Sequence, residues 1–180
     1  MGMRLFCAQN MENTNPNFVP GAVAPTGAEV RRDAKRWGDL AELKFTVKAA
    51  SLGICVSKPY GDRRPYDFLA ECGPQLWRVQ VKSVFTVRPD SHRLGFPIAS
   101  SRNRRGERAS YTAEQIDFIA AFVGPHDAWY VIPVDAIITR KFIRLYPGGR
   151  RRRGAGLFEE YREAWHLMTA VFECSEDRSP

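Results

Sequence analysis

Four side chains in the sequence have the types and the order that hydrolysis of a phosphodiester needs. Glu42 comes first, Asp67 follows it, and Gln80 and Lys82 are separated by a single residue. Such hydrolysis requires neutralising the charge of a phosphorane-like transition state and presenting a deprotonated water in line with the leaving oxygen. A Mg²⁺ ion held by carboxylates can do both. The four residues are therefore candidates for a metal-assisted hydrolytic site.

Two predicted strands position three of these side chains. Residues 66–71 and 76–85 are rich in β-branched and aromatic residues, and a Gly73-Pro74 turn joins them. In the second strand, alternation places Arg78, Gln80 and Lys82 on one face. The opposite face carries Trp77, Val79 and Val81. We expect the apolar face to enter the core and the polar face to form a site at the sheet edge, close to Asp67.

A predicted helix brings Glu42 to the same edge. Thr26 and Glu29 have the spacing of a capping box, and a helical pattern follows through Trp37 to Leu52. We expect its apolar stripe to be the buried face and Gly53 to end it. The stripe consists of Leu40, Leu43, Val47 and Ala50. Glu42 flanks this stripe, so its carboxylate could reach the other three residues.

The rest of the chain contributes further short elements. Strands are predicted at residues 54–57, 118–123 and 129–132, with a helical turn at 112–115 and a turn at Gly124-Pro125. Residues 87–110 have the composition of a basic loop. An amphipathic helix is predicted at residues 157–172. We expect a flexible tail at residues 1–28, a domain at 29–146, and a basic linker with a C-terminal helix packed on it at 147–180.

Charge and composition narrow the partners. The 27 Lys and Arg residues against 20 Asp and Glu residues give a net charge of +7, which attracts polyanions such as nucleic acid. No apolar run approaches the roughly 20 residues of a membrane helix, so we expect no membrane partner. The four cysteines show no C-x-x-C spacing. A reduced, cytoplasmic protein is the simplest interpretation.

These motifs together resemble the PD-(D/E)xK nuclease superfamily, in its group I intron homing endonuclease and Holliday junction resolvase branches. The resemblance covers roughly residues 31–138. Its order and spacing are those of Glu42, Asp67 and Gln80-x-Lys82. The sequence around these residues is also similar, namely Gly38-Asp39-Leu40-Ala41-Glu42, Pro65-Tyr66-Asp67-Phe68, Val79-Gln80-Val81-Lys82-Ser83, Asp117-Phe118-Ile119 and Trp129-Tyr130-Val131-Ile132-Pro133.

The resemblance implies an α/β restriction-endonuclease-like αβββαβ core, a mixed central sheet flanked by helices. It implies that Asp67 is the principal ligand of Mg²⁺, for which Mn²⁺ can substitute, and that the Val81 carbonyl supplies another oxygen. Lys82 would orient the water or steady the leaving charge, and Glu42 would bind the metal directly or through water. Gln80 stands where most members carry Asp or Glu, which lowers the expected affinity for the ion; the intron endonuclease branch is similar in using Gln.

The resemblance also implies double-stranded DNA as the substrate and a homodimer or homotetramer as the assembly. The expected DNA contacts are Arg78, Ser83, Arg102, Arg104, Arg105, Arg108, Arg150, Arg151, Arg152 and Arg153. Taken alone, the arginine runs are equally consistent with solvated loops, and Asp with Gln-x-Lys is equally consistent with surface charge. Three functions remain open: a homing-type DNA endonuclease, a structure-specific junction resolvase, and a nucleic-acid-binding module without catalysis.

Overall fold

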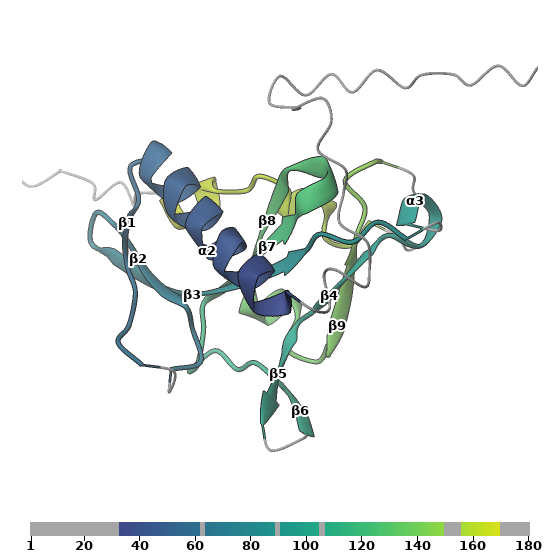
Figure 1. Cartoon of the computed structure of the whole chain (residues 1–180). Helices are drawn as coiled ribbons and strands as arrows, with labels where there is room; N and C mark the ends of the chain where they lie inside the picture. The colour runs from purple at the N-terminus through teal and green to yellow at the C-terminus, as the bar shows by residue number, and fades with distance from the viewer. Residues whose placement is uncertain (1–32, 62–63, 89–90, 105–106, 150–155, 170–180) are drawn as a thin grey trace, which may run out of the picture.

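A five-stranded mixed sheet forms the centre of the computed structural model, which describes residues 33–61, 64–88, 91–104, 107–149 and 156–169 (Figure 1). The strand order is β1-β2-β3-β7-β8. Neighbouring strands are antiparallel except for β3 and β7, which are parallel. The strands span Cys55–Ser57 (β1), Phe68–Cys72 (β2), Gln75–Val84 (β3), Phe118–Val123 (β7) and Ala128–Pro133 (β8). This confirms the predicted fold class and the predicted strands.

The turn between β2 and β3 sets the register around the site. Cys72 pairs with Gln75, so only Gly73 and Pro74 lie between the strands. Gly73 has a φ of 56°, a left-handed conformation that glycine adopts without steric cost. The turn fixes Phe68 opposite Val79, which leaves Asp67 just outside β2 and level with the middle of β3.

Helix α2 (Ala34–Ser51) packs on one face of the sheet (Figure 1). Its buried residues are Ala41, Phe45 and Ala49. The Phe45 ring lies 5.1 Å from the ring of Phe68 and 6.0 Å from that of Trp129, centre to centre. Small alanines on either side let the helix approach the sheet closely around this single large aromatic ring.

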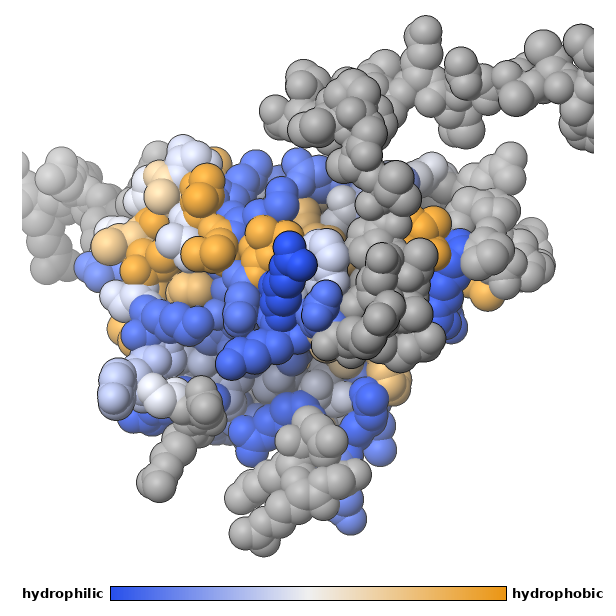
Figure 2. Space-filling model, in the orientation of Figure 1, coloured by the Kyte–Doolittle hydropathy of each residue, from blue (hydrophilic) through white to orange (hydrophobic). Residues whose placement is uncertain are grey.

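The predicted apolar stripe of this helix was therefore wrong. Leu43 and Val47 are 65% and 71% exposed, and Ala50 is also exposed, whereas Leu40 is partly buried. Apolar side chains gather over α2 on the face shown in Figure 2. The expected start at Thr26 and Glu29 lies outside the described residues. The expected stop at Gly53 is confirmed, since the helix ends at Ser51 and Gly53 has a φ of 74°.

A second, two-stranded sheet covers the other face. Strands β4 (Phe96–Ala99) and β9 (Phe142–Leu145) pair antiparallel, and their Phe96, Ile98, Ile143 and Leu145 pack against Ile119 and neighbouring residues. The prediction of a loop over residues 87–110 was wrong for β4 and for the β5–β6 hairpin, Ser101–Arg104 with Glu107–Ser110. Pairing of β4 with a strand more than forty residues later leaves no local pattern in the sequence. Helix α3 (Ser91–Leu94) is short, so β-structure rather than a long helix covers this face.

The predicted C-terminal helix was wrong over the described residues. A 3-10 turn, η3 (Glu159–Tyr161), and a short helix, α4 (His166–Thr169), stand in its place. Glu163 has a φ of 49°, and its backbone N–H donates to the Trp129 carbonyl oxygen at 2.9 Å. This bond to β8 stands where a helix would have an internal backbone hydrogen bond. Two further 3-10 turns are η1 (Gly124–His126) and η2 (Val134–Ala136). None of the described helices is long and apolar enough to span a membrane.

Candidate active site

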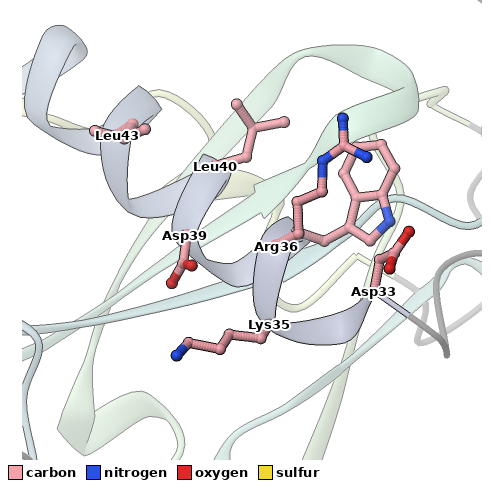
Figure 3. A pocket seen from close by; sticks show the side chains of 7 residues that line it. Asp33, Lys35, Arg36, Asp39, Leu40 and Leu43 are labelled. Atoms are coloured by element: carbon pink, nitrogen blue, oxygen red, sulfur yellow. The ribbon is translucent and has the colours of Figure 1, made fainter.

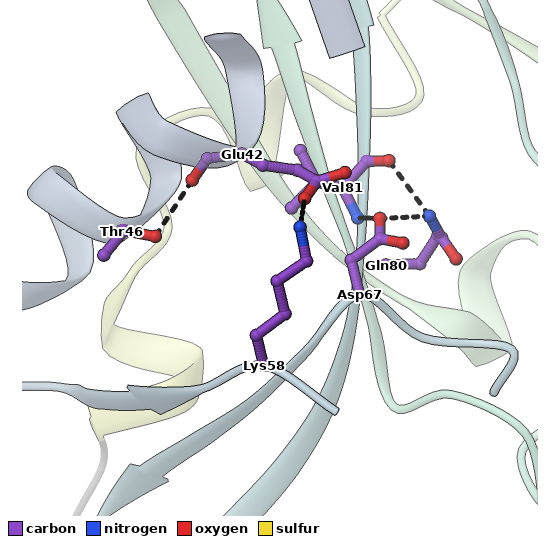
Figure 4. A network of polar contacts seen from close by, with 6 residues as sticks. All are labelled: Glu42, Thr46, Lys58, Asp67, Gln80 and Val81. Carbon is purple, nitrogen blue, oxygen red and sulfur yellow. Dashed lines mark hydrogen bonds and ion pairs between the residues drawn. The ribbon is translucent and has the colours of Figure 1, made fainter. Parts of the chain in front are cut away.

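The site lies where β3 runs past the start of β2, with Glu42 of α2 nearby (Figure 4). The Asp67 N–H donates to the Val79 carbonyl oxygen at 2.9 Å, which ties Asp67 to β3 before β2 begins. Gln80 and Lys82 lie on the same face of β3 by alternation. Gln80 is only 8% exposed, so it is a buried side chain of the site rather than a solvated surface residue.

Asp67, Gln80 and Val81 form one hydrogen-bonded cluster. The Val81 N–H donates to Asp67 Oδ2 at 2.9 Å. The Gln80 side-chain nitrogen donates to the same carboxylate oxygen and also to the Val81 carbonyl oxygen, the latter at 3.1 Å. Two acceptor oxygens thus converge on a single donor nitrogen, as they would converge on a cation.

Glu42 is paired with a lysine that the sequence did not single out. Lys58 Nζ lies 2.5 Å from Glu42 Oε2, and the two side chains are 63% and 22% exposed. Lys58 follows β1, and the pair borders a hollow lined also by Asp39, Thr46 and Phe68. No periodicity or motif marks Lys58, because its partner lies sixteen residues away in a different element.

Asp67 is a half-buried carboxylate that lies among both positive and negative groups. Burial raises the pKa of Asp67, and the charge of Glu42 raises it further. The Val81 N–H and the ammonium groups of Lys82 and Lys58 act in the opposite direction. Burial also lowers the pKa of Lys82, while Asp67 opposes that shift. Both groups lose part of their hydration, so an added cation would stabilise the negative charge of Asp67.

Tyr111 is a second residue that sequence reasoning missed. It is 2% exposed, and its ring centre lies 5.8 Å from Lys82 Nζ, within the range of a cation–π contact. Burial raises the pKa of Tyr111 to about 12; the charge of Asp67 adds to the shift and that of Arg102 opposes it. Only its place directly after a predicted basic loop could have drawn attention to it.

The available donors fit a hard divalent cation. Oxygens of Asp67, Glu42, the Gln80 amide and the Val81 carbonyl are of the type that Mg²⁺ and Mn²⁺ prefer. Within the described residues, no three His, Cys, Asp or Glu side chains gather into a cluster that could hold a metal. A site here therefore depends on amide and carbonyl oxygens beside carboxylates. For Gln80 to contribute its oxygen, its amide must turn over relative to the arrangement in Figure 4.

The predicted DNA contacts lie in different parts of the structure, and two of them lie on β3. The Arg78 guanidinium bonds both carboxylate oxygens of Asp117, at 2.7 and 3.0 Å, and the carbonyls of Ala113 and Glu114. This arginine holds the turn before β7. Ser83 alternates onto the α2 face of β3, away from Gln80 and Lys82.

The remaining predicted contacts lie on the hairpin or beyond the described residues. Arg102, Arg104 and Arg108 belong to the β5–β6 hairpin, and the Arg108 guanidinium lies 4.5 Å from the centre of the Phe142 ring. Arg105 and residues 150–153 lie outside the described ranges.

A separate hollow along α2 does not bring together side chains from different elements. It is lined by Asp33, Lys35, Arg36, Trp37, Asp39, Leu40 and Leu43. Figure 3 shows these side chains spread along the first half of one helix. No strand residue joins them. The cluster around Asp67 is therefore the candidate active site.

Comparison with known proteins finds one matching family and similar solved structures. A family model described as PD-(D/E)XK endonuclease matches residues 32–168. The solved structure of the bacterial homing endonuclease I-Ssp6803I is 34% identical to this chain, covers 77% of it and 94% of its own chain, and superposes with a TM-score of 0.66. Hjc, a Holliday junction resolvase from Archaeoglobus fulgidus, is 20% identical over 66% of this chain and 95% of its own, with a TM-score of 0.41. No curated protein matches in sequence.

Proposed function

Because the chain belongs to the PD-(D/E)XK endonuclease family, we propose that this endonuclease cuts double-stranded DNA and that Mg²⁺ supports the reaction. The observation that carries the proposal is the convergence of the Asp67 carboxylate, the Gln80 side chain and the Val81 carbonyl, with Lys82 next along the same strand. A divalent ion bound there would supply charge neutralisation at the scissile phosphate.

The chain's own residues divide the remaining work. Asp67 and the Val81 carbonyl would hold the ion, with the Gln80 amide oxygen as a neutral third donor. Glu42, which pairs with Lys58 here, would bind the ion directly or through water. Lys82 lies on the Gln80 face and is half-buried, so its ammonium would orient the attacking water or steady the charge on the leaving oxygen.

The similarity to I-Ssp6803I supports a homing-type endonuclease rather than a general nuclease. Cutting both strands of a duplex is simplest with two copies of the site related by symmetry, so we infer a homodimer or homotetramer. Light scattering of the purified protein with and without duplex DNA tests the assembly.

The decisive experiment is cleavage of supercoiled plasmid, linear duplex and a four-way junction with Mg²⁺. Asp67→Ala and Lys82→Ala should each reduce cleavage by at least about 100-fold while the thermal unfolding transition and DNA binding persist. Lys44→Ala is the matched control, because it removes an ammonium that is paired with Asp127 instead. Unchanged cleavage in both site variants would refute the assignment.

The same experiment distinguishes the alternatives. Cutting confined to the four-way junction would identify a resolvase. Gln80, which lacks a negative charge, motivates the third function, a nucleic-acid-binding module without catalysis. That module would show no Mg²⁺ or Mn²⁺ binding and a salt-sensitive DNA affinity that Asp67→Ala leaves unchanged.

A further inference from the structure

The β5–β6 hairpin is a two-stranded ribbon that begins and ends next to the candidate active site. Its strands pair only with each other among the described strands, and it extends away from the central sheet (Figure 1). At its base, the Ser100 and Ser101 hydroxyls donate to the Arg140 and Lys141 carbonyl oxygens at 2.8 and 3.1 Å. At its other end the chain continues directly into Tyr111, whose ring faces Lys82.

The register gives the ribbon two different faces. Ser101 pairs with Ser110 and Asn103 pairs with Arg108, so these positions share one face. That face turns toward β9, since Ser101 bonds the Lys141 carbonyl and Arg108 stacks on Phe142. Ser101 and Arg108 thus anchor the hairpin to the body of the protein.

The opposite face continues the active site. Arg102 pairs with Ala109, and Arg104 pairs with Glu107 further along the strands, so these four positions lie together. Alternation beyond β6 puts Tyr111 in line with this face. The charge of Arg102 acts on the Tyr111 phenol, which Asp67 also influences. Arg102 Nε is buried and has no hydrogen-bond partner within the described part of the chain.

The shape of the ribbon and the charge of Arg102 suit this face to a nucleic-acid backbone. A guanidinium presents a planar set of donors to phosphate oxygens, and the major groove of B-DNA admits a two-stranded ribbon.

We propose that the face of the hairpin bearing Arg102 is the DNA-binding surface next to the cleavage site, and that Arg102 binds the backbone of the duplex beside the phosphate that is cut. The proposal rests on the DNA-cutting function and assigns its substrate contact. It separates the arginines of the hairpin by role: Arg102 binds DNA, and Arg108 fixes the hairpin on Phe142.

The test is the affinity for a fluorescein-labelled 30-base-pair duplex in EDTA, measured from low to moderate NaCl. Arg102→Ala should weaken binding at least about tenfold at low salt. It should also reduce the slope of log affinity against log salt by about 0.9, the value for one phosphate contact. Arg144→Ala removes the same charge from an arginine that bonds the Leu94 carbonyl, and it should leave the slope unchanged.

Two variants keep the result decisive. Arg102→Lys retains the charge and should restore the slope, with weaker binding than the wild type because the paired donors are lost. Ala109→Glu places a carboxylate on the exposed position opposite Arg102 and should weaken binding even if Arg102→Ala does not fold. An unchanged slope in Arg102→Ala, an equal loss in Arg144→Ala, or unchanged binding by Ala109→Glu would each overturn the proposal.

The binding measurement contains no divalent ion, so it is independent of cleavage. If the wild type binds DNA but does not cut it with Mg²⁺, the catalytic proposal fails and the slopes still decide the role of Arg102. If the wild type cuts DNA and Arg102→Ala keeps its slope, only the assignment of the hairpin fails.

Discussion

The amide nitrogen of Gln80 donates a hydrogen bond to the carboxylate of Asp67, thirteen residues earlier in the chain. Because the same nitrogen also bonds the Val81 carbonyl at 3.1 Å, it stands between two oxygens that could hold a cation. The neutral amide of Gln80 satisfies the half-buried Asp67 carboxylate without adding negative charge. Gln80 therefore affects both the stability of the metal-free protein and its affinity for a metal ion.

Gln80→Glu should lower the stability of the metal-free protein and raise its affinity for Mg²⁺. The new carboxylate would lie beside Asp67 in a buried position and lose the donor that Gln80 supplies. We expect the metal-free variant to be less stable by about 1–3 kcal/mol and to gain more stability from Mg²⁺ than the wild type. Thermal unfolding in EDTA and in a Mg²⁺ series measures both effects. Gln75→Glu, at the far end of β3, is the control, and equal Mg²⁺ stabilisation of Gln80→Glu and the wild type would contradict the prediction.

Asp67→Asn should stabilise the metal-free protein at neutral pH. Burial raises the pKa of Asp67 above its unfolded value, so the folded protein binds the proton more tightly than the unfolded chain. The charged carboxylate therefore costs stability above the folded pKa, and this cost disappears as the pH falls below the unfolded pKa of about 4. Unfolding temperatures in EDTA should differ most near pH 7 and converge toward pH 4. A wild type that is more stable than Asp67→Asn at pH 7 in EDTA would disprove this.

Arg78 should prove to be structural. Its guanidinium bonds both oxygens of Asp117, and the side chains are only 31% and 22% exposed. Arg78→Gln should lower the free energy of unfolding by about 1–3 kcal/mol. Asp117→Asn should show strong coupling to it in a double-mutant cycle. The salt dependence of DNA binding should stay that of the wild type; a slope reduced by about 0.9 would restore Arg78 as a phosphate contact.

Substitutions on the exposed side of α2 should affect the free energy of unfolding much less than substitutions on its buried side. Leu43→Gln and Val47→Gln should alter the free energy of unfolding by no more than about 0.5 kcal/mol. Phe45→Ala should cost about 3–5 kcal/mol, because its ring packs against Phe68, Trp129 and Trp165. Chemical denaturation of the three variants measures the contrast. Comparable losses in all three would mean that Leu43 and Val47 are covered in the folded protein.

The helix illustrates what the sequence could and could not provide. Its extent was visible in the pattern around residues 37–52, but its rotation was not. Leu40, Leu43, Val47 and Ala50 form as regular a stripe as Ala41, Phe45 and Ala49. Aromatic residues from β2, β8 and the C-terminal segment surround Phe45 and decide between the two faces. Those partners are remote in sequence, so local hydrophobicity favoured the wrong face.

The site shows the same division. Alternation in β3 correctly grouped Gln80 with Lys82, and the short Gly73-Pro74 turn correctly brought Asp67 level with them. Both depend on local geometry. Lys58 and Tyr111 were missed because each meets the site only through tertiary structure: Lys58 through α2, and Tyr111 through the hairpin that β9 anchors.

The two lysines of the site should respond differently to substitution. Lys82 is half-buried and lies beside Asp67 and Tyr111, so Lys82→Met should reduce cleavage by about 10²- to 10⁴-fold. Lys58 is exposed and pairs with Glu42, a carboxylate that an incoming ion would share. Lys58→Met should therefore strengthen Mg²⁺ binding about 3- to 10-fold and keep cleavage within tenfold of the wild type. Calorimetric titration with Mg²⁺ alone and plasmid cleavage measure the two quantities separately. Weaker Mg²⁺ binding in Lys58→Met would mean that Lys58 organises Glu42 for the ion instead of competing with it.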